Sequence, residues 1–147
     1  MLPDADVIGF ALGIRYGSML GHRGLTHSVA FAVLTGVTVA LFASRKTHAL
    51  GTPWLILYFT LVTLSHPLLD MLTNGGLGVA LFAPLSGERY FLPWRPIEVS
   101  PIGVRFFSGR GLEVVISEIV WIWLPSLFLL FGAWIYRKVR GSRREAW

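Results

Sequence analysis

The sequence predicts an all-α integral membrane protein: a helical bundle with at least three transmembrane helices plus short re-entrant or interfacial segments. Hydrophobic residues fill 54% of the 147 positions and charged residues only 14%, whereas soluble domains carry about 25% charged residues. The mean hydropathy is +0.62. Three apolar runs, at about 26–43, 54–72 and 114–136, reach the roughly 17–25 residues that a membrane span requires. We expect one membrane-embedded domain over 1–147.

The first two runs have recognisable ends. Thr26 or Ser28 can cap the first helix, because a hydroxyl oxygen can accept a hydrogen bond from a backbone N–H of the first turn. Thr52 and Pro53 begin the second helix, since proline fits the first helical turn. The glycines of Asn74-Gly75-Gly76 stop it. These signals predict where both helices start and where the second one ends.

The segments outside the spans are polar or short. His48 lies in a basic turn with no acid nearby, so we interpret it as a loop residue rather than a ligand. The apolar stretch 77–85 is too short to span and is expected to be re-entrant or interfacial. Arginines alternate with aromatics and prolines in 86–110, which suits a loop at the lipid headgroups. Pro125 should kink the last helix.

Basic residues dominate the net charge of +5 and gather at 137–147. A basic segment next to a span favours anionic lipid at the cytoplasmic surface. By the positive-inside rule this tail is cytoplasmic, which predicts a multi-pass protein of the cell (inner) membrane. Membrane lipid is therefore an expected partner, and nucleic acid is a less favoured one. The oligomeric state is not predicted.

Cysteine is absent, so disulfides and thiolate metal sites are excluded. Any metal would be held by His, Asp, Glu or backbone oxygen, a ligand set that suits zinc, manganese or magnesium.

A His and an Asp lie near the end of the second run, in S-H-P-L-L-D-M-L-T-N. His66 and Asp70 are four positions apart and so share one face of a helix, to which Thr73 adds a hydroxyl. Pro67 removes a backbone donor and can kink the helix beside His66. Ionisable groups in apolar sequence are costly without partners, so this pair indicates a functional site.

Two further histidines lie in G-H-R-G-L-T-H-S at 21–28. Gly24 lets the backbone bend sharply, so His22 and His27 could turn toward one centre. Arg23 between them would suit an anionic substrate, particularly phosphate. The alternative is a capped loop with two exposed imidazoles. We predict that His22, His27, His66 and Asp70 converge.

Two carboxylates lie at the start of the chain, in M-L-P-D-A-D. Pro3 favours an extended or turn conformation, in which alternate side chains face opposite ways. One carboxylate should therefore bind a metal while the other orients an imidazole. We favour Asp4 over Asp6 as the ligand. Taken alone, the segment could equally be a solvated acidic terminus.

Together these motifs resemble the YdjM-like family of LexA-regulated, membrane-bound, metal-dependent hydrolases. The resemblance rests on L-P-D-A-D at 2–6, H-R-G-L-T-H-S at 22–28, H-P-L-L-D-M-L-T-N at 66–74 and R-Y-F-L-P-W-R-P-I at 89–97. It implies a distant relation to the zinc-dependent phospholipase C and S1/P1 nuclease fold. Family members usually begin with another helix carrying a Thr-His pair. Either the start is truncated or misassigned, or this chain lacks that helix.

The resemblance also implies roles for individual residues. The implied cofactor is a divalent metal ion, zinc by preference, with manganese or magnesium as alternatives. The implied metal ligands are Asp4, Asp6, His22, His27, His66 and Asp70. The implied catalytic residues are Asp6, Arg23 and Arg89, with both arginines contacting an anion.

Three functions compete. The first is hydrolysis of a phosphoester, lipid-like or small-molecule, by metal-activated water, with Asp6 or Asp70 as an alternative proton acceptor. The second is a non-catalytic membrane protein with a structural metal site. The third is an ion or solute transporter with His and Asp along the path, which the absence of an internal repeat disfavours. We rank the hydrolase first.

Overall fold

The computed structural model describes residues 2–45 and 51–144, which fall into two compact units divided after Arg95. His48 lies outside the described residues, as does the end of the tail at 145–147. The prediction of a single domain over 1–147 stays a prediction, and each unit is described by itself.

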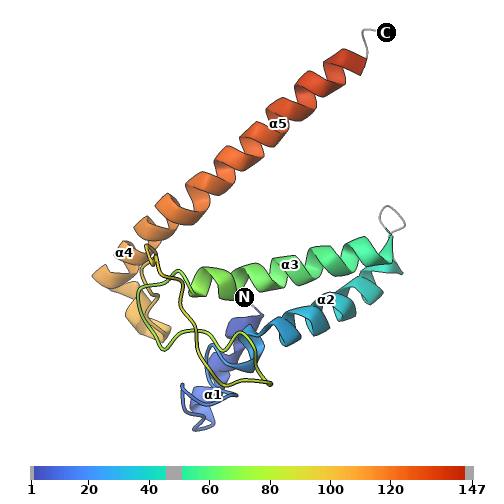
Figure 1. Ribbon diagram of the computed structural model, residues 1–147. Helices are drawn as coiled ribbons and strands as arrows, with labels where there is room; N and C mark the ends of the chain where they lie inside the picture. The colour runs from blue at the N-terminus through green and yellow to red at the C-terminus, as the bar shows by residue number, and fades with distance from the viewer. Residues whose placement is uncertain (1, 46–50, 145–147) are drawn as a thin grey trace. The chain divides into compact units, whose positions relative to one another are not determined.

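The first unit begins with two short turns of helix and continues with a pair of long helices (Figure 1). Its elements are the 3₁₀ helix η1 (Pro3–Val7), α1 (Ile8–Ala11), the 3₁₀ helix η2 (Leu25–His27), α2 (Val29–Ser44) and α3 (Thr52–Asp70). No strand is present in the part of the chain that the structure describes, where an isolated bridge joins Val79 and Tyr90. The prediction of an all-helical fold is confirmed for these residues.

Small residues let α2 and α3 pack closely. Ala32, Gly36 and Ala40 are spaced four apart on α2 and are all buried. A Cβ atom at Gly36 would lie only 2.7 Å from the backbone nitrogen of Thr60 on α3. Small residues at such spacing are typical of helix pairs in membranes, where close backbone approach supplies the packing energy.

The starts of both helices follow the sequence signals. Ser28 is the N-cap of α2, and its Oγ accepts a hydrogen bond from Phe31 N at 3.1 Å. α3 begins at Thr52 with Pro53 in its first turn. It continues through Pro67 and ends at Asp70. Both predicted helix starts are therefore confirmed.

The chain after α3 folds back on the start of the unit without forming a helix. Val79 and Tyr90 exchange backbone hydrogen bonds of 3.0 and 2.9 Å. Ala80 N donates to Arg23 O at 2.9 Å, and Val29 N donates to Leu81 O at 2.9 Å. These bonds hold the 22–29 segment against the loop that follows α3.

The second unit is dominated by one long helical stretch. It contains the 3₁₀ helix η3 (Gly103–Phe107), α4 (Gly109–Glu118), the π turn η4 (Ile119–Trp123) and α5 (Leu124–Arg144). The π turn lies just before Pro125. Because proline cannot donate to the preceding turn, a local change in the hydrogen-bond pattern accommodates it.

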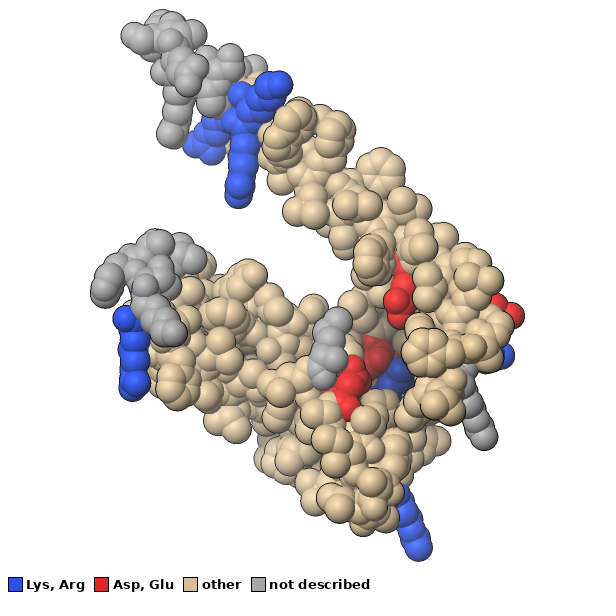
Figure 2. All heavy atoms as spheres, turned by 180° about the vertical axis from the view of Figure 1, so that it is seen from behind, with Lys and Arg blue, Asp and Glu red and all other residues tan. Residues whose placement is uncertain are grey.

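Two helical stretches among the described residues are long and apolar enough to cross a membrane: Thr52–Asp70, and Gly109–Arg140 with 32 residues. The first predicted span forms the shorter apolar helix Val29–Ser44, with 16 residues. The prediction of at least three spans is therefore not confirmed. In Figure 2 most of the surface over α2, α3 and α5 carries no charged side chain, and a group of Lys and Arg lies near the end of α5.

Candidate metal centre

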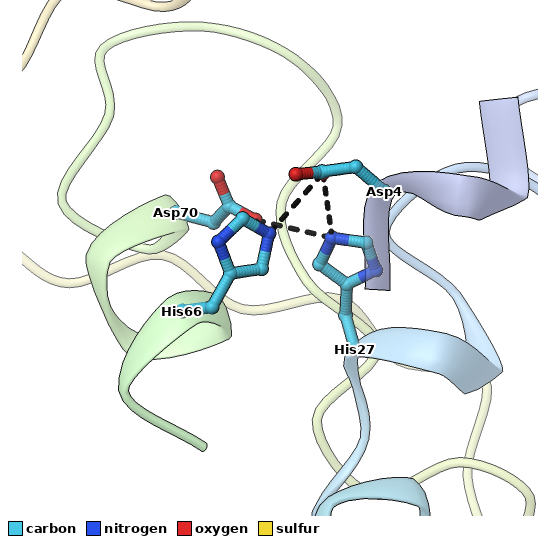
Figure 3. Close-up of side chains that lie close together, drawn as sticks. All are labelled: Asp4, His27, His66 and Asp70. Atoms are coloured by element: carbon cyan, nitrogen blue, oxygen red, sulfur yellow. Dashed lines mark hydrogen bonds and ion pairs between the residues drawn. The ribbon is translucent and has the colours of Figure 1, made fainter. Parts of the chain in front are cut away.

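Four side chains from three segments meet in the first unit (Figure 3). Asp4 comes from η1, His27 from η2, and His66 and Asp70 from successive turns of α3. Their ligand atoms all lie within 4.8 Å of one another. We call this group the four-residue ring, because its imidazoles and carboxylates alternate around a closed set of contacts.

The distances around the ring are similar. Asp4 Oδ1 lies 3.1 Å from His66 Nε2 and 3.4 Å from His27 Nε2. Asp70 Oδ2 lies 3.3 Å from His27 Nε2 and 3.5 Å from His66 Nε2. Around a metal with bonds of about 2.0–2.2 Å, neighbouring ligand atoms lie about 2.8–3.6 Å apart. The spacing of the four side chains therefore fits a small divalent cation.

Burial differs across the ring. The His27 side chain is fully buried, those of His66 and Asp70 are 13% and 14% exposed, and that of Asp4 is 37% exposed. His27 Nε2 and Asp70 Oδ2 are buried atoms with no hydrogen-bond partner among the described residues. The ring is thus closed at His27 and accessible at Asp4.

The other oxygen of Asp70 is held by Arg23. Arg23 Nη2 donates to Asp70 Oδ1 at 2.9 Å, and Nη1 donates to Thr73 Oγ1 at 2.9 Å and to Gly75 O at 3.2 Å. Arg23 is only 5% exposed. These contacts give Arg23 a role within the protein, and they do not support the predicted contact with an anionic substrate.

Asp6 lies behind His27 rather than in the ring. Its Oδ1 accepts a hydrogen bond from His22 Nδ1 at 2.7 Å. Its Oδ2 accepts from Thr26 Oγ1 at 2.6 Å and from Arg23 N at 3.2 Å, and lies 3.2 Å from His27 Nδ1. Asp6, His22 and His27 form a second group with metal-ligand spacing.

This arrangement differs in two ways from the sequence-based interpretation. The structure brings His27, His66 and Asp70 together with Asp4, but it places His22 beside Asp6, against the aromatic rings of Phe10 and Tyr16. The segment of Asp4 and Asp6 is a 3₁₀ helix rather than extended. With three residues per turn, positions two apart still face different ways, so the expected division between the two carboxylates has a different cause.

Arg89 supports the backbone near the ring. Its Nη1 donates to His22 O at 3.2 Å and Gly78 O at 3.1 Å, and its Nη2 donates to Tyr16 O at 3.0 Å and Ser18 O at 3.1 Å. All four carbonyls belong to loops of the first unit. The geometry therefore favours a role in holding these loops together over the predicted phosphate contact.

The charges at the site perturb one another. Burial alone would raise the pKa of Asp4, but His27 and His66 outweigh it and hold that pKa well below its usual range. The pKa of Asp6 is likewise held low against burial by His22, His27 and Thr26. Burial alone would lower the pKa of His27, but Asp4, Asp6 and Asp70 raise it to about 10. The carboxylates thus hold a positive charge at His27.

Two hydroxyls matter more than the sequence suggested. Thr26 contacts Asp6 and His27, and Thr73 accepts from Arg23 while donating to Asp70 O at 2.7 Å. In the sequence, Thr26 stands next to His27 and Thr73 falls on the helix face of Asp70. These positions indicate a supporting role, because a polar residue next to a ligand can orient it. The backbone carbonyls that Arg89 contacts could not be identified from the sequence in this way.

Comparison with known proteins places the chain among inner membrane proteins. A family model described as YdjM inner membrane protein matches residues 1–141. The inner membrane protein YbcI of Escherichia coli (strain K12) is 42% identical over 139 residues, which cover 94% of this chain and 80% of that protein. No solved structure matches the chain significantly.

Proposed function

The chain belongs to the family of YdjM inner membrane proteins, and from this premise we propose that it is a membrane-bound, divalent-metal-dependent hydrolase. The four-residue ring holds the metal, with zinc preferred and manganese or magnesium as alternatives. The substrate is a phosphoester presented at the membrane surface.

The observation that carries this proposal is a pair of buried atoms, His27 Nε2 and Asp70 Oδ2, which face each other as an ion pair but make no hydrogen bond of good geometry. A buried polar atom without a partner costs about 1–3 kcal/mol, more if it is charged. The two atoms lie 3.3 Å apart and face the same ring. A cation between them would satisfy both at once, together with Asp4 and His66.

The donor set supports metal chemistry of a particular kind. Two imidazoles and two carboxylates suit zinc and manganese. A bound divalent ion lowers the pKa of water and so supplies hydroxide near neutral pH. Arg23 holds Asp70 Oδ1, which directs Oδ2 into the ring. The exposed edge at Asp4 is where a substrate would reach the ring.

The phosphoester class rests on the cation and on the membrane location. A cation at the ring would attract the anionic oxygens of a phosphoester, and lipid headgroups supply such groups at the surface of a membrane. Arg23 and Arg89 hydrogen-bond to other groups of the protein, so neither is assigned a contact with the phosphoester.

A structural metal site is the second candidate, and one specific observation favours it. The ring offers four protein ligands, and structural zinc sites are closed by four protein ligands, whereas catalytic sites usually keep one position for water. The 37% exposure of Asp4 favours the catalytic alternative, because this ligand lies where solvent can enter.

Both candidate functions can be tested on full-length protein purified in detergent. It is stripped with a chelator, reloaded with zinc, manganese or magnesium, and analysed for bound metal and for turnover of lipid and nucleotide phosphoesters. His66→Ala should lose metal and turnover together. Ser65→Ala, whose hydroxyl donates to Val62 O, is the matched control and should retain both.

Three outcomes decide between the candidates. Metal-free wild-type protein after reloading, or full metal and turnover in His66→Ala, would overturn the proposal. Stoichiometric metal with no turnover of any phosphoester would favour the structural site. Turnover that follows metal content across both variants would support the hydrolase.

A further inference from the structure

The two nitrogens of the His27 ring face different surroundings. Nε2 faces Asp4 and Asp70 in the four-residue ring, at 3.4 and 3.3 Å. Nδ1 faces the opposite way, 3.0 Å from Thr26 Oγ1 and 3.2 Å from Asp6 Oδ2. The side chain is fully buried, so these neighbours decide which nitrogen keeps its hydrogen when the other binds a cation.

The hydroxyl of Thr26 determines whether Nδ1 carries a hydrogen. A hydroxyl has one hydrogen to donate, and Thr26 donates it to Asp6 Oδ2 at 2.6 Å. Toward His27 the hydroxyl therefore presents a lone pair. Asp6 is a carboxylate and presents only acceptors. Because both neighbours of Nδ1 are acceptors, Nδ1 must be the donor.

We infer that Thr26 and Asp6 act together as positioning residues, which hold a hydrogen on Nδ1 of His27 so that Nε2 is the nitrogen that gives up its hydrogen and binds a cation in the four-residue ring. This inference rests on the proposed function, because the choice of Nε2 as the binding nitrogen matters only if a cation occupies the ring. A carboxylate behind a metal-binding imidazole orients the ring and increases its basicity.

The same contacts give Asp6 a role different from that of a ligand. Its Oδ1 accepts from His22, and its Oδ2 accepts from Thr26 and from the Arg23 backbone. With both oxygens engaged, Asp6 would have to give up these bonds to enter a metal site. Thr26 is therefore the residue that best isolates the positioning role, because its hydroxyl can be removed without removing a charge.

The test compares Thr26→Val with the conservative Thr26→Ser in full-length protein labelled with ¹⁵N at histidine. In zinc-free wild-type protein, NMR should show a hydrogen-bonded Nδ1–H of His27, identified by its absence from His27→Gln. On addition of zinc, Nε2 should lose its hydrogen while Nδ1 keeps its own. In Thr26→Val the Nδ1–H signal should shift, and in Thr26→Ser it should stay in place.

Zinc affinity supplies the second measurement. Loss of such a supporting contact typically weakens metal binding about 10–100-fold, so Thr26→Val should bind zinc at least roughly tenfold more weakly. Thr26→Ser should bind it with nearly wild-type affinity. Asp6→Asn, if it folds, should weaken binding further.

The outcomes separate the inference from the proposed function. An Nδ1–H that is absent in zinc-free wild-type protein, lost on zinc addition or unchanged in Thr26→Val overturns the inference. So does wild-type zinc affinity in Thr26→Val. If wild-type protein binds no zinc, the proposed function fails, while the zinc-free spectra still decide whether Thr26 holds a hydrogen on Nδ1.

Discussion

Arg23 and Asp70 form a buried ion pair across 47 positions of sequence, with Arg23 Nη2 2.9 Å from Asp70 Oδ1. Their side chains are 5% and 14% exposed. Arg23 also has a positive φ of 59°, a conformation that is uncommon outside glycine. The surrounding contacts therefore maintain a backbone conformation that brings the guanidinium to the end of α3.

Arg23→Gln should destabilise the protein by about 3–5 kcal/mol, because removing one partner leaves the other charge buried without compensation. The measurement is thermal or denaturant unfolding in detergent. Arg45→Gln, at the exposed end of α2, is the control and should unfold close to the wild type. Equal stability of the two variants would mean that the ion pair does not contribute to the stability of the folded protein.

Arg89→Gln should lower stability by at least about 2–3 kcal/mol. The guanidinium makes four hydrogen bonds to backbone carbonyls, and a hydrogen bond to a charged group contributes about 1.5–3 kcal/mol. Unfolding of the variant is compared with that of Arg95→Gln, whose exposed guanidinium lies over Phe91.

If Arg89 instead served only an anionic substrate, Arg89→Gln would unfold like the wild type and lose turnover alone. That result would restore the phosphate contact expected from the sequence.

Gly36→Ala should weaken the α2–α3 pair by about 1–3 kcal/mol or more, as overpacking does in close-packed interiors. The added Cβ would meet Thr60 Oγ1 and backbone together. Gly132→Ala in α5 meets nothing within 4 Å and should be neutral or stabilising, since alanine favours helix. Comparing the unfolding of the two variants separates packing from helix propensity.

The stability of zinc-free protein should fall as pH rises from 6.5 to 10. The pKa of His27 is raised from 6.5 to about 10 in the folded protein. A raised pKa contributes stability that is complete below the unfolded pKa and is lost as pH rises through the folded pKa. The unfolding temperature measured across this range checks the sign.

His27→Gln should remove this part of the pH dependence. Zinc should oppose the loss of stability at high pH in the wild-type protein. Zinc binding at Nε2 displaces a proton, so the zinc affinity rises with pH over the same range. A zinc affinity independent of pH would contradict Nε2 as the binding atom.

Local pattern was sufficient to predict part of the site. His66 and Asp70 share a face because four positions separate them on a helix, and Ser28 caps α2 as its chemistry predicts. The choice of Asp4 over Asp6 as ligand stays a prediction, because each carboxylate belongs to a group with metal-ligand spacing, and the backbone that carries both is a 3₁₀ helix.

The rest of the candidate site could not be predicted, because it depends on contacts between segments that are distant in the sequence. The rings of His22 and His27 lie 5.5 Å apart, yet only His27 belongs to the four-residue ring. His22 instead donates to Asp6, whose other oxygen contacts Nδ1 of His27. Arg89 binds carbonyl groups, which every residue possesses and which no sequence pattern distinguishes. An arginine beside a predicted site can therefore hold the fold as readily as it can hold a substrate.

The order of the ring residues along the chain has a consequence for biogenesis. Asp4 and His27 precede α2, whereas His66 and Asp70 end α3. Synthesis runs from the N-terminus, so the ring cannot close until α3 has left the ribosome. A cation bound there would join the beginning of the chain to the end of α3 and restrict the unfolded ensemble as a cross-link does. Metal uptake would then follow the synthesis of this helix pair rather than guide it.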